Sequence, residues 1–228
     1  MCEKREAMNK FVPEIKGILR RHIIEVPESI EQASGIRIFG KVIRSIAFTT
    51  DVAIIKNINA DAIIAVYPFT PQPSITQVIT MAADVPVFCG IGGGITTGKR
   101  VVNLALDAEF KGAIGVVVNA PTPNDVVKAI RDTIDIPVVV TVVSENTDFK
   151  ARVEAGASIL NVSGAANTPN IVKKIRDQLP DIPIIATGGP TDETIMACIE
   201  AGANAITYTP PTTGELFKVL MDKYRKEV

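Results

Sequence analysis

The chain repeats two kinds of strand-start signal in strict alternation. The first is Asp-x-Pro followed by an apolar run, and its copies are Asp84–Pro86, Asp135–Pro137 and Asp181–Pro183. The second is a small turn followed by an apolar run, and its copies centre on Ala62, Ala113, Ala157 and Ala203. Successive copies of either kind are 44 to 51 residues apart. A period of this length that contains two strand starts indicates a repeated unit of two strands and two helices.

The apolar runs are short, continuous and rich in Val and Ile, as expected for parallel strands buried on both faces. Amphipathic stretches such as Asn124–Ile134 and Asn170–Leu179 separate them. The eight predicted strands are residues 45–50, 62–68, 86–91, 113–119, 137–143, 158–163, 183–188 and 204–209. Eight equal strand–helix units favour a closed (β/α)₈ TIM barrel over the alternative, an open doubly wound sheet.

The first part of the chain lies outside the repeat. We expect residues 1–43 to form an N-terminal helical extension that packs on the barrel, which residues 44–228 form. Within the extension, Pro13–Arg21 is predicted to be a helix and Ile36–Val42 a strand that covers the bottom of the barrel. The last predicted helix of the barrel is Gly214–Lys226.

Composition excludes several classes of function. A formal net charge of −1 argues against nucleic acid as a partner, because binding to the phosphate backbone needs a basic surplus. The chain has no apolar run long enough to span a membrane and no signal-peptide pattern. Its three cysteines are widely spaced, which is typical of reduced thiols in a cytoplasmic protein. A single histidine, His22, leaves little material for a histidine metal site or a Ser-His relay.

The alternation of side chains along each strand predicts what lines the mouth of the barrel. Counting from each start signal, the even positions gather polar residues near the strand ends, so we place this set inward. The predicted mouth is lined by Asn119, Thr141, Asn161, Ser163, Thr187 and Thr209. These residues could satisfy one another's hydrogen bonds, but as a set at the C-terminal end of a barrel they favour a ligand-binding role.

Charged candidates for chemistry are few. Asp51 follows the first strand and Glu145 the fifth, and either carboxylate could act as a general base. The alternatives are a helix N-cap for Asp51 and a solvated loop residue for Glu145. With Asn119 or Asn161 as a neutral partner, the two carboxylates could instead hold Mg²⁺, although no metal or other cofactor is expected. No lysine lies at a strand end, which argues against a Schiff-base aldolase.

A glycine-rich loop, Gly90–Arg100, follows the third strand and opens a helix. Gly93 to Lys99 has the spacing G-x-x-x-x-G-K, but a P-loop needs Ser or Thr next and Arg100 stands there. A nucleotide triphosphatase is therefore not indicated. Gly93, Gly94 and Lys99 could still bind an anion at the helix N-terminus, and the alternative is a flexible loop over the mouth.

A second glycine pair, Gly188-Gly189, follows Thr187 at the end of the seventh strand. Barrels commonly bind phosphate with the loops after strands seven and eight. After the eighth strand, Pro210 and Pro211 remove two amide donors. The remaining candidate donors are Thr212, Thr213 and Gly214.

The segment Ile182–Ile206 resembles the last quarter of the phosphate-binding barrels: thiamin-phosphate synthase, the tryptophan-pathway barrels and the ribulose-phosphate-binding group. This resemblance implies a phosphorylated small molecule held by Gly188 and Gly189. It covers the final third of the chain well and the first third poorly. Those families usually carry Gly-Ser or Gly-Thr after strand eight, whereas this chain has Tyr208–Pro211.

A second resemblance is to the glycerol-uptake-operon antiterminators. It rests on three parts of the C-terminal half besides the glycine pair, namely Asn161–Pro169, Ala205–Thr207 and Glu215–Phe217. It implies a barrel that senses glycerol phosphate and binds messenger RNA, but the chain shows no basic patch. Flavin barrels also use a Gly-Gly loop after strand seven, but no further flavin signature is present, so FMN is not expected.

Two hypotheses follow. The first is a metabolic enzyme of the lyase or isomerase class that acts on a small phosphorylated or carboxylated metabolite. The second is a non-catalytic sensor of a phosphorylated metabolite, of the antiterminator type. In either case we expect a homo-oligomer in the cytoplasm.

Overall fold

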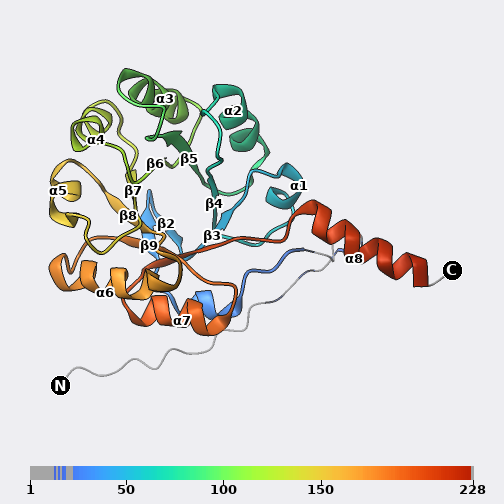
Figure 1. The fold of residues 1–228 in the computed structure, drawn as a ribbon. Coiled ribbons are helices and arrows are strands. Elements are labelled where there is room, and N and C mark those ends of the chain that lie inside the picture. Colours follow the sequence, from blue (N-terminus) through green and yellow to red (C-terminus); the bar gives the residue numbers. More distant parts are fainter. Residues whose placement is uncertain (1–12, 14, 16, 19–22, 227–228) are drawn as a thin grey trace.

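A computed structural model describes residues 13, 15, 17–18 and 23–226 of the chain. Its centre is a closed barrel of eight parallel strands in the order β10-β3-β4-β5-β6-β7-β8-β9 (Figure 1). The strands are β3 (Ser45–Phe48), β4 (Ala62–Ala65), β5 (Val87–Gly92), β6 (Gly115–Val118), β7 (Val138–Val142), β8 (Ile159–Val162), β9 (Ile184–Thr187) and β10 (Ala205–Tyr208). Each lies within or overlaps a predicted strand, so the predicted (β/α)₈ barrel is confirmed.

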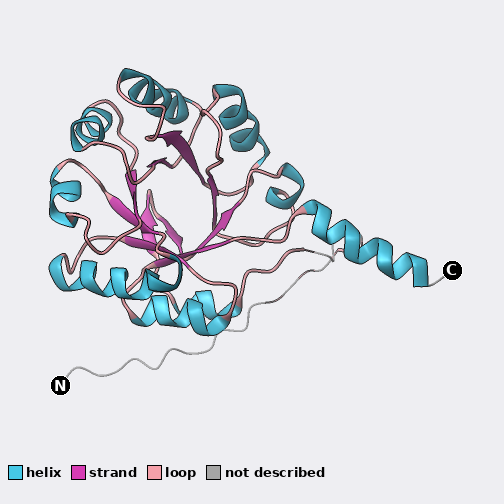
Figure 2. Cartoon of the chain, in the orientation of Figure 1, coloured by secondary structure: helices cyan, strands magenta, loops and turns pink. Residues whose placement is uncertain are grey.

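Helices surround the strands on the outside (Figure 2). They are α1 (Val52–Ile55), α2 (Pro73–Ala82), α3 (Lys99–Phe110), α4 (Asn124–Arg131), α5 (Phe149–Glu154), α6 (Thr168–Gln178), α7 (Asp192–Glu200) and α8 (Thr213–Lys226). Two short 3₁₀ helices are η1 (Glu28–Gln32) and η2 (Ala165–Asn167). The last helix, α8, projects away from the barrel (Figure 1), and none of its residues is buried. No helix in the described part of the chain has the length and apolarity needed to cross a membrane.

Both faces of the barrel strands are buried, which explains their continuous apolar sequences. Outward side chains such as Val116, Leu160 and Ile206 pack with the helices in one apolar cluster. Inward side chains such as Val117 and Val139 form a separate cluster inside the barrel. The predicted alternation of inward and outward positions is thereby confirmed.

The pairing of neighbouring strands arranges the inward side chains in levels, each supplied by alternate strands. One level consists of Ile46, Phe88, Val139 and Ile185. The next level toward the C-terminal end holds Ile64, Val117, Asn161 and Thr207. Above it lie Phe48, Gly90, Thr141 and Thr187. The interior therefore changes from wholly apolar to partly polar on the way to the mouth.

A β-hairpin closes the opposite, N-terminal end. It consists of β1 (Ile36–Ile38) and β2 (Lys41–Ile43), which pair antiparallel. The prediction of one strand over Ile36–Val42 was wrong because Phe39 and Gly40 both have positive φ, at 45° and 84°, and reverse the chain. Buried Ile36, Ile38 and Ile43 join the interior cluster, so the hairpin does cover the bottom of the barrel as predicted.

The rest of the predicted extension is only partly described. Most of the predicted helix Pro13–Arg21 lies outside the described residues, and its described residues are not helical. Further along, Ile24 forms an isolated bridge with Ile58, next to α1. The division of the chain at residues 43 and 44 stays a prediction.

Candidate functional site

A cavity of about 540 Å³ opens at the C-terminal end of the barrel. It is lined by the segments that follow four strands: Phe48–Asp51, Val66–Pro68, Asn119 and Thr209–Thr212. Parallel strands bring their C-terminal ends to one edge of the sheet, which is why loops so far apart in the sequence meet here. The cavity lies at the end of the barrel where the sequence predicted a binding site.

Two polar atoms inside the barrel have no hydrogen-bond partner among the described residues. They are Oδ1 of Asn161 and Oγ1 of Thr207. Asn161 is 9% exposed and Thr207 is 4% exposed, and both lie at the same inward level. Buried polar groups normally have partners, because leaving one unsatisfied costs free energy. These two atoms are therefore available to hydrogen-bond a bound molecule or an ordered water.

The mouth has two chemically different sectors. On the consecutive strands β7 to β10, the inward residues of the two levels nearest the C-terminal end are polar: Thr141, Asn161, Thr187 and Thr207. On β3 to β6, the corresponding residues are mainly apolar: Phe48, Ile64, Val66, Gly90, Val117 and Asn119. The hydroxyls of Thr141 and Thr187 make no hydrogen bond to another described residue. We call these the polar sector and the apolar sector.

Asp51 lies in the cavity lining and also caps a helix. Its Oδ1 accepts hydrogen bonds from the N–H groups of Ala53, at 2.8 Å, and Ile54, at 3.3 Å. Its Oδ2 accepts a hydrogen bond from the hydroxyl of Thr213, the first residue of α8. The Thr213 hydroxyl and the two N–H groups lower the pKa of Asp51, against an opposing effect of burial. The carboxylate is thus held ionised, as the predicted N-cap, and is a weak base.

The other predicted catalytic residues are divided between the cavity and the surface. Asn119 lines the cavity, and Asn161 lies on the level below the cavity walls. Glu145, by contrast, is exposed in the turn after β7, where its backbone carbonyl accepts a hydrogen bond from Lys174. The structure thus brings Asp51, Asn119 and Asn161 to one end of the barrel and leaves Glu145 outside the cavity.

This donor set does not fit a resident Mg²⁺. Among the cavity-lining residues Asp51 is the one carboxylate, and both its oxygens already accept hydrogen bonds. The described residues contain no group of three or more His, Cys, Asp or Glu side chains that could hold a metal ion. Mg²⁺ sites use one or two carboxylates together with water and substrate oxygens, and the one carboxylate in this lining is already held by Thr213 and the start of α1.

The loop after β5 is folded against its neighbours. Gly93 is buried, and its N–H donates to the carbonyl of Thr96 at 2.9 Å. The carbonyl of Gly92 accepts a hydrogen bond from the N–H of Asn119 at 2.9 Å. Lys99 lies at the start of α3 and lines a separate groove between α3 and α4. Of the predicted anion-binding residues in this loop, only Gly94 is an exposed glycine, and anion binding here stays a prediction.

The glycine pair after β9 lies beside a second cavity, of about 530 Å³. This cavity is lined by Ala165, Ala166, Thr168, Pro169, Thr187–Pro190, Glu193, Thr194, Ala197 and Cys198. Close packing accounts for both glycines: an added Cβ would lie 2.8 Å from Ile206 at Gly188 and 2.3 Å from Thr194 at Gly189. The N–H of Gly188 already donates to the carbonyl of Thr207 at 3.3 Å. Phosphate binding at this pair stays a prediction.

The candidate donors after β10 form the N-terminal cap of α8. The N–H of Thr212 donates to the Glu215 carboxylate at 2.7 Å, and the N–H of Glu215 donates to the Thr212 hydroxyl at 3.2 Å. This is a capping box, and the sequence signal for it, Thr-x-x-Glu, is present in Thr212–Glu215. Thr213 is engaged with Asp51, and Gly214 is exposed. The cap explains the loop without a ligand.

Sequence reasoning missed two features of the site. The sequence did not assign Tyr67 to the site, yet β4 ends at Ala65 and Tyr67 lines the cavity, with its hydroxyl accepting the N–H of Gln72 at 2.9 Å. Thr207 was not assigned to the site either. The signal for Thr207 was the polar residue at a central strand position that is otherwise apolar.

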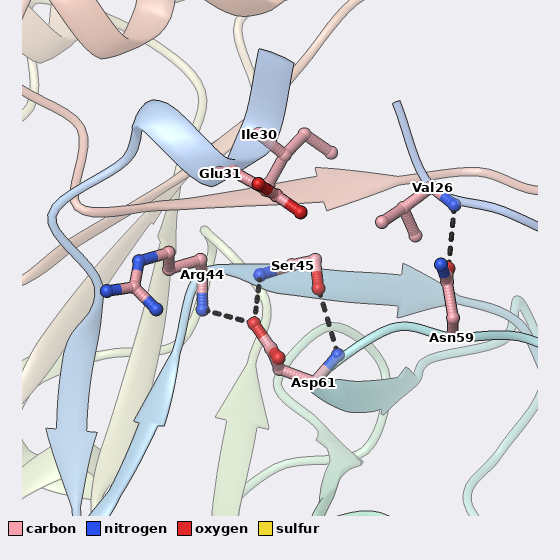
Figure 3. Close-up of a pocket in the computed structure, with 7 residues that line it drawn as sticks. All are labelled: Val26, Ile30, Glu31, Arg44, Ser45, Asn59 and Asp61. Carbon is pink, nitrogen blue, oxygen red and sulfur yellow. Dashed lines mark hydrogen bonds between the residues drawn. The ribbon is translucent and has the colours of Figure 1, made fainter. Parts of the chain in front are cut away.

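A third cavity, of about 390 Å³, lies at the N-terminal end of the barrel (Figure 3). Several of its polar groups have partners within the chain. Oδ2 of Asp61 accepts the N–H groups of Arg44, at 2.8 Å, and Ser45, at 3.0 Å. Oδ1 of Asn59 accepts the N–H of Val26 at 2.8 Å. In (β/α)₈ barrels this end stabilises the fold, and the pairing here is of that kind.

Three solved structures with a similar fold are described as enzymes. One is a 2,3-dimethylmalate lyase of the PEP mutase/isocitrate lyase superfamily, with a TM-score of 0.63 and 13% identity over 91% of this chain and 85% of that one. Another is a phosphoenolpyruvate phosphomutase from Streptomyces platensis subsp. rosaceus, with a TM-score of 0.59 and 12% identity over 79% and 80% of the two chains. A phosphonopyruvate hydrolase in complex with oxalate and Mg²⁺ has a TM-score of 0.56 and 12% identity over 81% and 92%.

At these identities the likeness establishes the fold and no more. A scan against protein-family models finds no match, and neither does a search of curated proteins. The structures support the (β/α)₈ barrel that the sequence resemblance implied. Membership of the ribulose-phosphate-binding group itself stays a prediction.

Proposed function

We propose that the chain is a metabolic enzyme of the lyase class that binds a small polar metabolite in the mouth of the barrel. The observation that carries this proposal is the pair of buried, unpartnered atoms, Asn161 Oδ1 and Thr207 Oγ1, beneath an open cavity. A stable fold gains nothing from such atoms unless something binds them. Fold neighbours described as lyases and mutases support the reaction class.

The finer parts of the proposal come from the sequence. We expect the metabolite to be phosphorylated or carboxylated, and Gly189, which lines the second cavity, is the candidate position for an anionic group. The proposal also includes an isomerase, because the sequence indicated a lyase or an isomerase. The protein would act in the cytoplasm without a resident metal. A homo-oligomer is supported by the exposed apolar side chains of α8, among them Phe217 (59% exposed) and Val219 (73% exposed).

Within the cavity, Asp51 would orient the substrate and would not remove a proton. Its pKa is lowered, so it stays ionised and accepts a hydrogen bond from a substrate hydroxyl. Asn119, from the opposite side of the cavity lining, can both donate and accept a hydrogen bond. The proton transfers of a lyase reaction would then use substrate groups or water, because the described cavity lining holds no other carboxylate.

The first experiment is a thermal-shift screen of small hydroxy acids, oxo acids and phosphorylated metabolites, followed by product detection for each compound that binds. A ligand of the folded state raises the melting temperature by mass action. Asp51→Asn should lower turnover at least tenfold for the true substrate. The matched control is Asp148→Asn, because Asp148 also caps a helix, accepting the N–H of Ala151 at 3.0 Å, but lies outside the cavity. Equal turnover in the two variants would contradict a role for Asp51 in the site.

One observation favours the second function, a metabolite sensor without catalysis. Apart from Asp51 and Tyr67, the cavity lining contains no ionisable side chain, which is sparse for acid–base chemistry. A sensor would bind its ligand tightly with no turnover. Glycerol phosphate is the probe for this case, and RNA binding that does not respond to it would remove the antiterminator reading.

A further inference from the structure

We propose that the polar sector binds the uncharged end of the ligand, an end that carries hydroxyl or carbonyl groups, and that any anionic group of the ligand stays outside it. This inference rests on the proposed function, since it concerns the ligand of the same mouth. It goes further than the proposed function by naming the chemical groups on the end of the ligand that lies deepest in the mouth. Three observations carry it: the unpartnered groups, the absence of positive charge, and the position of the apolar sector.

The first observation concerns hydrogen bonding. Oδ1 of Asn161 and Oγ1 of Thr207 lie on one level, and the hydroxyls of Thr141 and Thr187 lie on the level above. A hydroxyl both donates and accepts, and an amide oxygen accepts. A ligand hydroxyl, or a water held beneath it, can satisfy the amide oxygen as donor and the threonine hydroxyls as acceptor or donor. The amide oxygen and the threonine hydroxyls together therefore match a ligand group that can both donate and accept a hydrogen bond.

The second observation concerns charge. Across the inward positions of the eight strands and the lining of the mouth cavity, no side chain is a lysine, arginine or histidine. The single formal charge there is the carboxylate of Asp51, which repels an anion. Burying a phosphate or carboxylate without a cationic partner costs far more than burying a hydrogen-bonded neutral group. An anion therefore has no favourable position on the floor of the mouth.

The third observation concerns the opposite wall. Phe48, Val66 and Val117 present apolar surface across from the threonines. A ligand in the mouth would contact hydroxyls along one edge and hydrocarbon along the other. Polyols and hydroxyketones have this character, with C–H groups on one face and oxygens on the other. The substrate class we infer is a small polyol or hydroxyketone, with or without an anionic group at its far end.

The test uses the full chain and defined probes. The side-chain amide signal of Asn161, assigned by its loss in Asn161→Leu, is followed by NMR during titration. The neutral probes are erythritol and dihydroxyacetone, and the anionic probes are inorganic phosphate and oxalate. We expect a saturable shift of the Asn161 amide with at least one neutral probe, and none with phosphate or oxalate.

Variants locate the binding. Thr187→Val and Thr207→Val should each weaken binding of the neutral probe at least fivefold, since each removes one hydroxyl and keeps the shape of the side chain. Thr133→Val is the control, because Thr133 bonds to the carbonyl of Ala129 on the outside of the barrel. If folding fails in one threonine variant, the other still decides the result.

Two outcomes would overturn the inference. Tighter binding of oxalate or phosphate at the Asn161 amide would show an anion site on the floor; the ligand class would then be wrong while the proposed enzyme would stand. Failure of both neutral probes to shift the amide, or equal binding in all three valine variants, would also refute recognition by the polar sector. Failure of the proposed function is separate, because it appears as absence of turnover with every compound that binds.

Discussion

The two ends of the barrel differ in whether their polar side chains have hydrogen-bond partners within the chain. At the N-terminal end, Asp61 accepts N–H groups from Arg44 and Ser45, and the guanidinium of Arg44 donates to the carbonyl of Ala33 at 3.0 Å (Figure 3). At the C-terminal end, buried atoms of Asn161 and Thr207 have no partner in the described chain. At the closed end Asp61 and Arg44 have partners within the chain, and at the open end two buried neutral groups have none.

This difference distinguishes polar groups that stabilise a barrel from polar groups that bind a ligand. A polar residue whose partners belong to the chain contributes to stability, and its loss should destabilise the fold. A buried polar residue without a partner reduces stability and needs another reason to be present. Substitutions at the two ends of the barrel test this contrast.

We expect the largest loss of stability from Gly93→Ala, which tests how tightly the loop after β5 packs at the open end of the barrel. Gly93 has φ of +112°, and an added Cβ would lie 1.8 Å from the hydroxyl of Thr122. Backbone strain and displacement of a buried side chain should together lower the free energy of unfolding by about 3 kcal/mol. Urea unfolding measures the change. Gly94→Ala is the control, because its Cβ would meet nothing within 4 Å, and an equal loss there would contradict the explanation.

Arg176→Met should weaken the closed end. The guanidinium of Arg176 donates to the carbonyls of Pro180, Ile182 and Gly202 and to Oδ1 of Asn204. Removing it leaves these acceptors without their charged donor and should cost about 2 kcal/mol in urea unfolding. The control, Arg225→Met, breaks an exposed pair with Asp222 and should cost less than about 0.5 kcal/mol. A comparable loss of stability in both variants would mean that the hydrogen bonds of Arg176 contribute no more than an exposed ion pair.

The same substitution at two buried threonines should change the free energy of unfolding in opposite directions. Thr207→Val removes an unpartnered hydroxyl and should raise the free energy of unfolding by about 1 kcal/mol. Thr122→Val removes a hydroxyl that donates to the carbonyl of Asn119 at 2.8 Å, and should lower it by about 1 kcal/mol. Both changes can be followed by urea unfolding of the ligand-free protein. Destabilisation in both variants would mean that Thr207 has a structural partner, such as a tightly held water.

Asp51→Asn should change how stability depends on pH. The folded-state pKa of Asp51 is lowered, chiefly by the Thr213 hydroxyl, so its stabilising contribution is present above the unfolded-state pKa near 3.8. That contribution is lost as the pH falls through the lower, folded-state pKa. The melting temperatures of the two proteins should therefore differ most near neutral pH and converge in strong acid. A constant difference at all pH values would show that ionisation of Asp51 contributes nothing.

The barrel could be predicted because its strands are defined by local, repeated chemistry. Proline and small residues mark where strands begin, and continuous Val- and Ile-rich runs fix their burial. The hairpin was harder to predict from the sequence, because phenylalanine rarely adopts the positive φ that Phe39 has here. The helix Thr213–Lys226 was predicted nearly to the residue, but its projection from the barrel was not, because an amphipathic sequence indicates an apolar face without indicating what covers it.

The site was predictable in outline and not in its pairings. Alternation along the strands correctly placed Asn161 inward. Whether a polar side chain has a partner depends on contacts far apart in the sequence, such as the bond between Asp51 and Thr213. For the same reason Gly93 could be interpreted as an anion-binding glycine, although its contact with Thr122 gives a packing reason for it.

The hairpin at the bottom has a kinetic consequence. Ile36, Ile38 and Ile43 fill the lower end of the barrel, so a molecule in the mouth can leave only by the route through which it came. A departing product must vacate the cavity before the next substrate arrives, and the two exclude each other. For an enzyme with one substrate and one product, inhibition by that product should therefore be competitive, with an unchanged maximal rate.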